Sequence, residues 1–224
     1  MATSVVGSVV FLKIAEFARR SASEQARLRA QLEAVIAVVT AELAPASRLV
    51  LDAADGAAVV LLRNPAAALR VARRALNAAA AGLPLAAGLN HGALQVSGRK
   101  GAEGMTGDGI AVAANIAAFA DSSRLLASRA FREALADAAP GREAMLRPAG
   151  TFTDSGLRSH EVFTPDEDAL GRRSRRYAAV ALAFVIASIA GGLGWRAHEG
   201  RPPFVDAMLA KYTYLHGLVQ RTRF

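Results

Sequence analysis

Residue types that commonly do chemistry are sparse in this 224-residue sequence. It contains no cysteine, which excludes disulfides, a thiolate nucleophile and cysteine-ligated zinc. The four histidines show no metal-ligand spacing, and we interpret His91 as a turn residue. No Gly-x-Ser-x-Gly elbow is present, so Ser122 and Ser123 are expected in a loop before a strand. The sequence offers no complete set of side chains for nucleophilic or zinc catalysis.

Two glycine-rich stretches raise the question of phosphate binding. Residues 98–101 (GRKG) have the composition of a phosphate loop but lack the G-x-x-x-x-G-K-[ST] spacing, so we expect an exposed basic turn. Residues 104–109 (GMTGDG) do not match G-x-G-x-x-G, and no predicted strand precedes them. We therefore interpret residues 98–109 as a glycine-rich loop.

The formal net charge of +8 is unevenly distributed along the chain. Residues 1–171 contain 18 basic and 17 acidic side chains, which leaves 9 basic and 2 acidic ones for residues 172–224. A nucleic-acid-binding domain would be expected to concentrate basic residues on its own surface. Because the larger part of the chain is nearly neutral, we expect no nucleic acid as a partner.

The basic C-terminal part contains a candidate membrane span. Residues 177–195 are 19 consecutive residues without a charge, which as a helix would cross roughly 30 Å of hydrocarbon. Tyr177 and Trp195 stand at its two ends, where interfacial aromatic residues are favoured. Four arginines precede it: Arg172, Arg173, Arg175 and Arg176. The pattern predicts a single transmembrane helix at 177–195, after a basic linker at 166–176 and before a short tail at 196–224.

The flanking charges also predict an orientation. Basic residues next to a membrane span favour the cytoplasmic side, so the four arginines place residues 1–171 in the cytoplasm, although Arg196 and Arg201 make the far flank basic as well. The preference for arginine over lysine, together with abundant alanine, is typical of GC-rich bacterial genes. We therefore expect a single-pass protein of the bacterial inner membrane.

Residues 1–165 show the alternation of strands and helices typical of one α+β domain. Strands are expected at residues 5–14, 48–51, 57–62, 83–89, 93–96, 125–127, 145–152 and 160–163. Helices are expected after a capping box at 21–24 and at 65–81, 110–119 and 129–138. Tight turns are predicted at 52–56 and at 90–92. Hairpins mixed with crossover helices indicate a ferredoxin-like α/β sandwich with a mostly antiparallel sheet.

Five short motifs in this domain have a characteristic order: residues 11–17 (FLKIAEF), 54–56 (ADG), 88–96 (GLNHGALQV), 106–116 (TGDGIAVAANI) and 124–128 (RLLAS). In this order and spacing they resemble the catalytic domain of class III nucleotide cyclases, the adenylate and guanylate cyclases. The resemblance covers about residues 5–165. It implies the cyclase-homology fold, and an active site that lies across a dimer interface.

The resemblance also implies which positions would carry the chemistry. Members of the family use two carboxylates to hold two divalent ions; the first falls at Lys13 and the second is retained as Asp55. The base-reading lysine and aspartate fall at Leu51 and Gly104. The ribose-orienting asparagine falls at Ala111, and the transition-state arginine at Asn115. Only Asp55 keeps the family's residue type, so the metal site that the resemblance implies is reduced to the single ligand Asp55.

These replacements predict a membrane-anchored pseudo-cyclase, a dimerising regulatory or scaffolding module that is not an enzyme. We expect no cofactor, and a homodimer or a heterodimer with another cyclase-like domain or membrane protein. Lys13 is expected to pair with Asp55, or to mimic a metal's charge and hold a nucleotide without catalysis. The first alternative is a weakly active or partner-completed cyclase, which would need Mg²⁺ or Mn²⁺. The second alternative is a purely structural tail-anchored protein.

Overall fold

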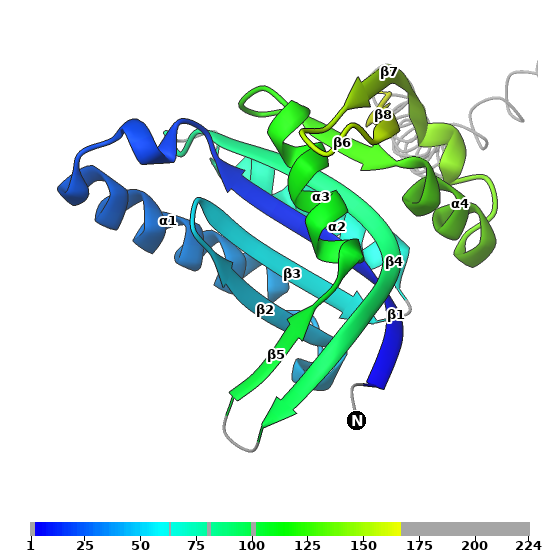
Figure 1. Cartoon of the computed structure of the whole chain (residues 1–224), viewed down its shortest axis with the longest axis horizontal. Helices are drawn as coiled ribbons and strands as arrows, with labels where there is room; N and C mark the ends of the chain where they lie inside the picture. The colour runs from blue at the N-terminus through cyan, green and yellow to red at the C-terminus, as the bar shows by residue number, and fades with distance from the viewer. Residues whose placement is uncertain (1–2, 63, 80–81, 100–101, 167–224) are drawn as a thin grey trace, which may run out of the picture. The chain divides into compact units, whose positions relative to one another are not determined.

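The computed structural model describes residues 3–62, 64–79, 82–99 and 102–166, which belong to one compact unit, Met1–Glu167 (Figure 1). Its strands are β1 Thr3–Ile14, β2 Arg48–Ala53, β3 Gly56–Leu62, β4 Leu85–Arg99, β5 Ala102–Thr106, β6 Leu125–Ser128, β7 Leu146–Thr153 and β8 Ser159–Pro165. Its helices are α1 Ala22–Thr40, α2 Pro65–Ala79, α3 Asp108–Phe119 and α4 Arg129–Ala138, with 3₁₀ turns at Phe17–Arg19, Pro45–Ser47 and Glu143–Met145. The four helices and most strands follow the order expected from the sequence, but the two strands expected at 83–89 and 93–96 form the single strand β4, and β5 was not expected.

The strands form one sheet in the order β2-β3-β1-β4-β6-β8-β7, with β5 paired to β4 outside this path. In the described residues every pairing is antiparallel except the parallel one between β4 and β6. The predicted α+β class and the mostly antiparallel sheet are therefore confirmed. The central pair is β1 and β4, whose register places Ile14 opposite Leu85 and Thr3 opposite Val96.

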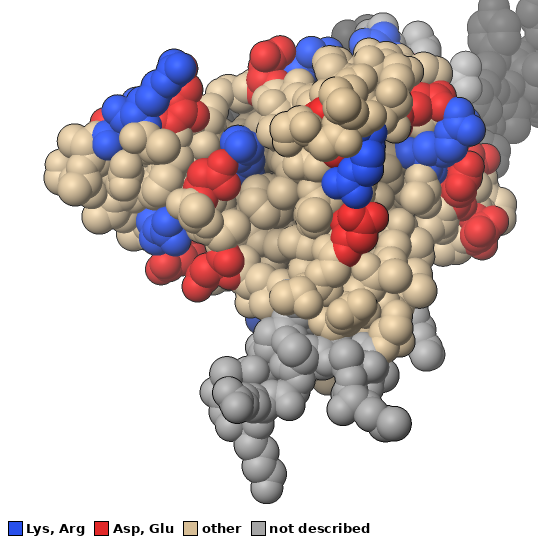
Figure 2. Space-filling view, viewed as in Figure 1, with Lys and Arg blue, Asp and Glu red and all other residues tan. Residues whose placement is uncertain are grey.

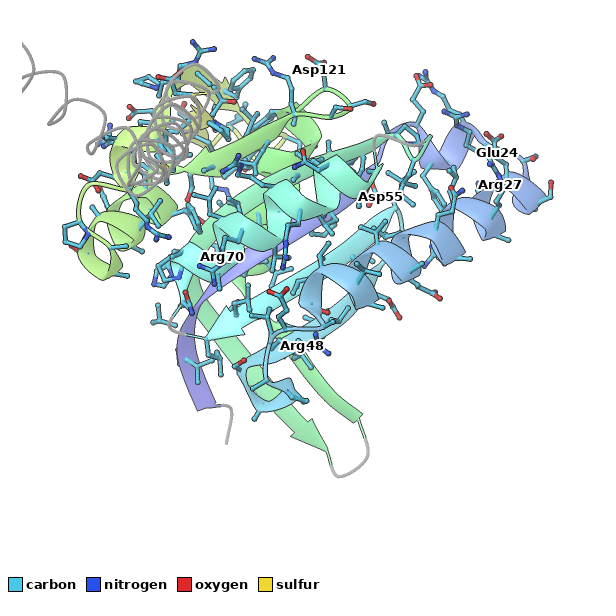
Figure 3. All side chains as sticks on the ribbon, turned by 180° about the vertical axis from the view of Figure 1, so that it is seen from behind. Glu24, Arg27, Arg48, Asp55, Arg70 and Asp121 are labelled. Carbon is cyan, nitrogen blue, oxygen red and sulfur yellow. The ribbon has the colours of Figure 1, made fainter. Side chains whose placement is uncertain are left out.

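One face of the sheet is covered by α1, α2 and α4. Ser21 caps α1 by accepting a hydrogen bond from the Glu24 backbone N–H at 3.4 Å. Apolar residues at helical spacing then turn one side of α1 toward the sheet: Leu28, Leu32, Ile36 and Val39. Figure 3 views this helix layer, with Arg27 and Arg70 on its outer surface. The main hydrophobic core lies between these helices and the sheet.

Helix α3 lies on the opposite face and approaches the sheet very closely at Gly88 of β4. A Cβ added at Gly88 would lie 2.2 Å from the Ala113 carbonyl oxygen and 2.5 Å from the Ala117 nitrogen. Only a residue without a side chain allows this approach. A second apolar cluster forms here from residues of β1, β2, β3, β4 and α3.

Two local predictions are wrong. No turn forms at residues 90–92, because β4 runs without interruption from Leu85 to Arg99 and pairs with β1 along most of its length. His91 is therefore a strand residue, with its Nδ1 2.9 Å from Ser8 Oγ. The stretch predicted as a loop at 98–109 contains strand β5 and the first residues of α3.

The predicted membrane segment lies outside the described residues, as do Arg172, Arg173, Arg175, Arg176, Tyr177 and Trp195. Within the described part of the chain, no helix is long and apolar enough to span a membrane.

Candidate functional site

Lys13 and Asp55 are brought together by the pairing of β1 with β3. Lys13 lies opposite Gly56 in this register, and the Ile14 backbone N–H donates to the Asp55 carbonyl oxygen at 2.8 Å. Gly56 allows the close approach, because a Cβ there would lie 2.0 Å from the Leu12 carbonyl oxygen. The Lys13 Nζ atom lies 2.8 Å from Asp55 Oδ2, and both side chains are about one-third exposed, at 31% and 36%. The ion pair expected from the sequence is present.

This pair does not fit the two-metal site that cyclase chemistry requires. Divalent cations such as Mg²⁺ prefer several oxygen ligands, usually including more than one carboxylate or phosphate. At this site one carboxylate already interacts with an ammonium group, which would repel a second cation. Among the described residues, no group of three histidine, aspartate or glutamate side chains has a geometry that could hold a metal ion.

Leu51 lies on the same face of the sheet as Lys13 and packs against an apolar cluster. It is half-buried in the cluster around Phe11 and Ala58, its neighbours across the β2–β3 and β3–β1 pairings. A leucine here has no polar atom with which to distinguish one base from another. Gly104, the other position assigned to base reading, lies in β5 opposite Ser97 of β4.

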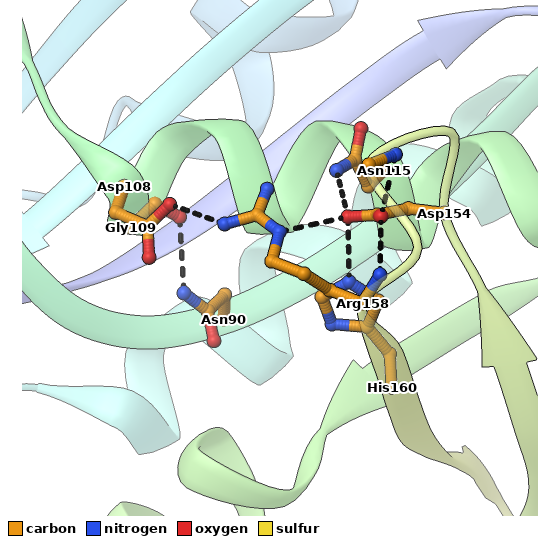
Figure 4. A network of polar contacts seen from close by, with 8 residues as sticks. Asn90, Asp108, Gly109, Asn115, Asp154, Arg158 and His160 are labelled. Atoms are coloured by element: carbon orange, nitrogen blue, oxygen red, sulfur yellow. Dashed lines mark hydrogen bonds and ion pairs between the residues drawn. The ribbon is translucent and has the colours of Figure 1, made fainter.

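Ala111 and Asn115 both lie on α3, one helical turn apart. Asn115 Nδ2 donates a hydrogen bond to Asp154 Oδ2 at 3.0 Å (Figure 4). Its amide is therefore bound to the loop between β7 and β8. Ala111 has no polar side-chain atom with which to orient a ribose.

Asp154 is the centre of this polar network, and its side chain is 3% exposed. Its carboxylate also accepts hydrogen bonds from His160 Nε2, Arg158 Nε, and the backbone N–H groups of Gly156 and Arg158, at 2.9–3.1 Å. The hydrogen bond from His160, followed by those from Arg158, holds the pKa of Asp154 well below its ordinary value. Arg158 also bridges to Asp108 at the start of α3, at 2.9 Å.

The sequence did not point to this network, because its members are far apart along the chain. The available signal was local: an aspartate two residues before a glycine, which favours a turn closed by the carboxylate. A second polar network lies beside it and was likewise not predicted from the sequence. In this network Asn90 donates a hydrogen bond to the Gly109 carbonyl oxygen and accepts one from Ser128 Oγ.

A cavity of about 570 Å³ lies between β4, the first half of α3, the start of α4 and the β7–β8 hairpin. Its lining includes Asn90, His91, Ser128 and His160. Burial lowers the pKa of His91, which favours its neutral form. The four named side chains already have partners within the protein: Ser128 bonds to Asn90, His91 to Ser8 and His160 to Asp154.

No family model matches the sequence, and no curated protein matches it. Several solved structures, in contrast, are similar to this chain. The adenylate/guanylate cyclase/hydrolase from Silicibacter pomeroyi aligns with 74% of this chain and 98% of its own, at 16% identity and a TM-score of 0.58. The guanylate cyclase domain of RhGC from Catenaria anguillulae gives the same coverage and TM-score at 13% identity.

The adenylyl cyclase CyaB from P. aeruginosa aligns with 74% of this chain and 96% of its own, at 14% identity and a TM-score of 0.56. At such identities the likeness concerns the fold and not the activity. The described residues have the mixed α+β fold of the class III adenylyl and guanylyl cyclase catalytic domains.

Proposed function

We propose that this chain is a catalytically silent cyclase-like module, anchored to a bacterial membrane by residues 177–195, that dimerises and regulates or scaffolds a signalling partner. The observation that carries the proposal is the 2.8 Å ion pair between Lys13 and Asp55. It stands at the two positions where the resemblance calls for metal carboxylates.

The rest of the site supports the same conclusion. Cyclisation of a nucleoside triphosphate needs its charge to be stabilised as it develops, by metal ions and by cationic side chains. Here Leu51 is packed among apolar residues, and Asn115 is bonded to the Asp154 carboxylate. A lysine in place of one metal carboxylate and an asparagine in place of the arginine would remove the main sources of catalysis that the resemblance implies.

Dimerisation is supported by the fold. One of the matching structures is a non-canonical dimeric guanylyl cyclase domain of the RhoGC fusion protein from Blastocladiella emersonii, which aligns with 73% of this chain at a TM-score of 0.56. A module that retains the fold without the chemistry can still act through a partner that recognises its surface. The partner would be a second copy or another cyclase-like domain.

Membrane anchorage is proposed from the sequence of residues 166–224. The uncharged stretch, its terminal aromatic residues and its arginine-rich flank together match a single span. Expression in bacteria followed by alkaline extraction tests it. The full chain should stay with the membrane pellet, and recovery in the soluble fraction would contradict anchorage.

A cyclase assay tests the absence of catalysis. The full chain, reconstituted in lipid, is incubated with ATP or GTP and Mg²⁺ or Mn²⁺, alone and with co-expressed cyclase domains. We expect no cyclic nucleotide above the level of an empty-membrane control. Product that disappears in Asp55→Ala would establish the alternative, a cyclase that is weakly active or completed by a partner.

Calorimetry tests whether the site nevertheless binds a nucleotide. If the Lys13 ammonium group replaces the positive charge of a metal ion, ATP or GTP should bind without Mg²⁺. Lys13→Ala should then abolish the heat of nucleotide binding. An absence of heat at millimolar nucleotide would restrict Lys13 to its ion pair with Asp55.

A further inference from the structure

The outer surface of α2 carries more positive charge than its neighbours compensate. The helix contains three arginines and no acidic residue. Arg70, Arg73 and Arg74 are all exposed, because the apolar residues of α2 face the main core. Glu42 of α1 pairs with Arg74 at 2.9 Å, and this pair, with a smaller contribution from Arg70, lowers the pKa of Glu42. One carboxylate therefore faces three guanidinium groups.

Helix α1 extends this basic region. Arg27 is exposed on α1 and lies next to the C-terminal end of α2, where it lines a hollow with Ala79. Figure 3 shows Arg27 and Arg70 on the same outer layer. In the described part of the chain, Arg27, Arg70 and Arg73 form no hydrogen bond or ion pair. Glu33, the acidic residue in the middle of α1, lies on the side of that helix next to β2. It does not compensate the arginines of α2.

An exposed apolar residue lies within the basic region. Val38 is 71% exposed and precedes Glu42 by one helical turn, so it lies on the same side of α1 as the Glu42–Arg74 pair. An apolar side chain among basic ones is typical of helices that lie on a membrane surface. We call the outer sides of α1 and α2, with Arg27, Arg70, Arg73 and Val38, the basic helix surface.

The opposite face of the sheet has a different distribution of charge. There Lys13 pairs with Asp55, and Arg158 bonds to both Asp108 and Asp154. In Figure 2, which views this face, most lysine and arginine side chains adjoin acidic ones. The unpaired arginines are therefore concentrated on the basic helix surface.

The described chain ends beside the same layer of helices. The Asp166 backbone N–H donates to the Met145 carbonyl oxygen at 2.8 Å, and Met145 packs against the core that α1 and α2 cover. Two further exposed arginines, Arg142 and Arg147, lie close to Met145 in the sequence. Residues 167–176 separate Asp166 from the proposed membrane span, and a segment of this length reaches at most about 35 Å. The domain is therefore held near the bilayer if the span is inserted.

An anionic lipid surface matches these features. Lipid phosphates accept hydrogen bonds from guanidinium groups, and each arginine near an anionic membrane strengthens binding about fivefold. A tethered domain meets the lipid at high effective concentration, so a few arginines suffice to hold one face on it.

We propose that the basic helix surface lies on the anionic headgroups of the membrane, with Arg27, Arg70 and Arg73 bound to lipid phosphates and Val38 at the level of the headgroups. The proposal rests on the proposed anchorage and adds an orientation to it. Helix α3 and the Lys13–Asp55 pair, on the opposite face of the sheet, then face away from the membrane and toward a partner.

Fluorescence quenching by spin-labelled lipid tests this orientation in the full chain. Because the sequence has no cysteine, one fluorophore is attached either to Ala78→Cys, at an exposed position of α2, or to Ala118→Cys, at an exposed position of α3. The chain is reconstituted in vesicles of phosphatidylcholine and phosphatidylglycerol that contain phosphatidylcholine with a nitroxide on its headgroup. We expect the label at 78 to be quenched at least about threefold more than the label at 118, since the arginines hold α2 against the headgroups.

Charge variants test the cause of the difference. Arg70→Gln/Arg73→Gln removes two charges and no hydrogen bond, so the fold should be kept. Quenching at 78 should then fall to that at 118, because the loss of two arginines weakens the attraction about 30-fold. Arg19→Gln/Arg124→Gln is the matched control, since it removes two exposed arginines that pair with Glu16 and Asp121. This control should leave quenching at 78 unchanged.

Lipid charge and salt provide a second control. In vesicles of phosphatidylcholine alone, or in about 1 M salt, where charges are screened within about 3 Å, the labels at 78 and 118 should be quenched equally. A difference that persists there, or in Arg70→Gln/Arg73→Gln, would show that the arginines do not cause it and would overturn the proposal.

Flotation with vesicles separates this proposal from the anchorage on which it rests. Chain that floats with both kinds of vesicle, but is quenched equally at 78 and 118 in the anionic ones, would leave the anchorage standing. It would overturn the orientation in favour of an acidic protein partner for the basic helix surface. Chain that floats with neither kind contradicts both proposals. Chain that floats with anionic vesicles alone, with the label at 78 quenched, would contradict the span and support the basic helix surface as a lipid-binding site.

Discussion

Asn115 of α3 donates a hydrogen bond to Asp154 Oδ2 at 3.0 Å, although the two residues lie 39 positions apart. The resemblance assigns a transition-state arginine to position 115. In this chain the position instead connects a helix to the β7–β8 hairpin, together with Arg158 and His160 (Figure 4). In the described structure, position 115 therefore makes a structural contact between α3 and the loop that follows β7.

The pH dependence of stability should report on Asp154. Its pKa is depressed in the folded state, mainly by the hydrogen bond from His160 and then by those from Arg158. The stabilisation is therefore fully present above the unfolded pKa of about 3.9 and is lost as the pH falls below it toward the folded value. Melting curves between pH 7 and pH 3 should show a smaller acid-induced decrease for Asp154→Asn than for the unmodified protein. Parallel curves for the two proteins would contradict this.

Asn115→Asp should destabilise the fold more than Asn115→Ala at neutral pH. The aspartate would place a second carboxylate about one hydrogen bond length from Asp154, and like charges at this distance disfavour ionisation. Asn115→Ala only removes a donor. The difference between the two melting temperatures should shrink near pH 4, where one carboxylate becomes protonated. A difference that does not change with pH would exclude this electrostatic explanation.

Gly88→Ala should displace α3 from the sheet. The added methyl group would lie 2.2 Å from the Ala113 carbonyl oxygen, and overpacking of this kind costs about 1–3 kcal/mol or more. Gly92→Ala is a matched control on β4, since its nearest neighbour, Asn90 Nδ2, lies at 3.5 Å. Denaturant unfolding should show a large decrease in the free energy of unfolding for Gly88→Ala and a small change in it for Gly92→Ala. Equal losses would mean that α3 does not rest on Gly88.

Ser128→Ala should weaken the start of α4. Ser128 Oγ accepts from the Phe131 backbone N–H at 2.9 Å and donates to Asn90 Oδ1 at 2.7 Å. Loss of such a cap costs about 1–2 kcal/mol, and Asn90 would lose a partner as well. Ser128→Thr retains the hydroxyl group, so its free energy of unfolding should be close to that of the unmodified protein. A Ser128→Ala variant as stable as the Ser128→Thr one would show that the cap contributes little.

The element order of the domain could be predicted because it depends on local patterns, such as the capping serine at 21 and the helix that follows it. The prediction was wrong at residues 90–92, which have the composition of a turn. Asn90 there bonds to Gly109 and Ser128, and pairing with β1 keeps residues 90–92 in a continuous strand. Such long-range contacts leave no trace in the local sequence.

In the candidate site, too, some contacts could be predicted from the sequence and others could not. The Lys13–Asp55 pair could be anticipated because both residues belong to motifs with a known relationship in the family. The network around Asp154 could not, because it depends on how the β7–β8 loop folds back on α3.

The central claim, that a lysine has replaced the metal site, is tested most directly by Mn²⁺ binding. Titration followed by electron paramagnetic resonance of free Mn²⁺ compares the full chain with Lys13→Asp, which places two carboxylates where one ion pair now stands. We predict no Mn²⁺ binding to the unmodified chain at millimolar metal, and measurable binding to Lys13→Asp that is lost in Lys13→Asp/Asp55→Ala. Stoichiometric Mn²⁺ binding by the unmodified chain that disappears in Asp55→Ala would contradict the account.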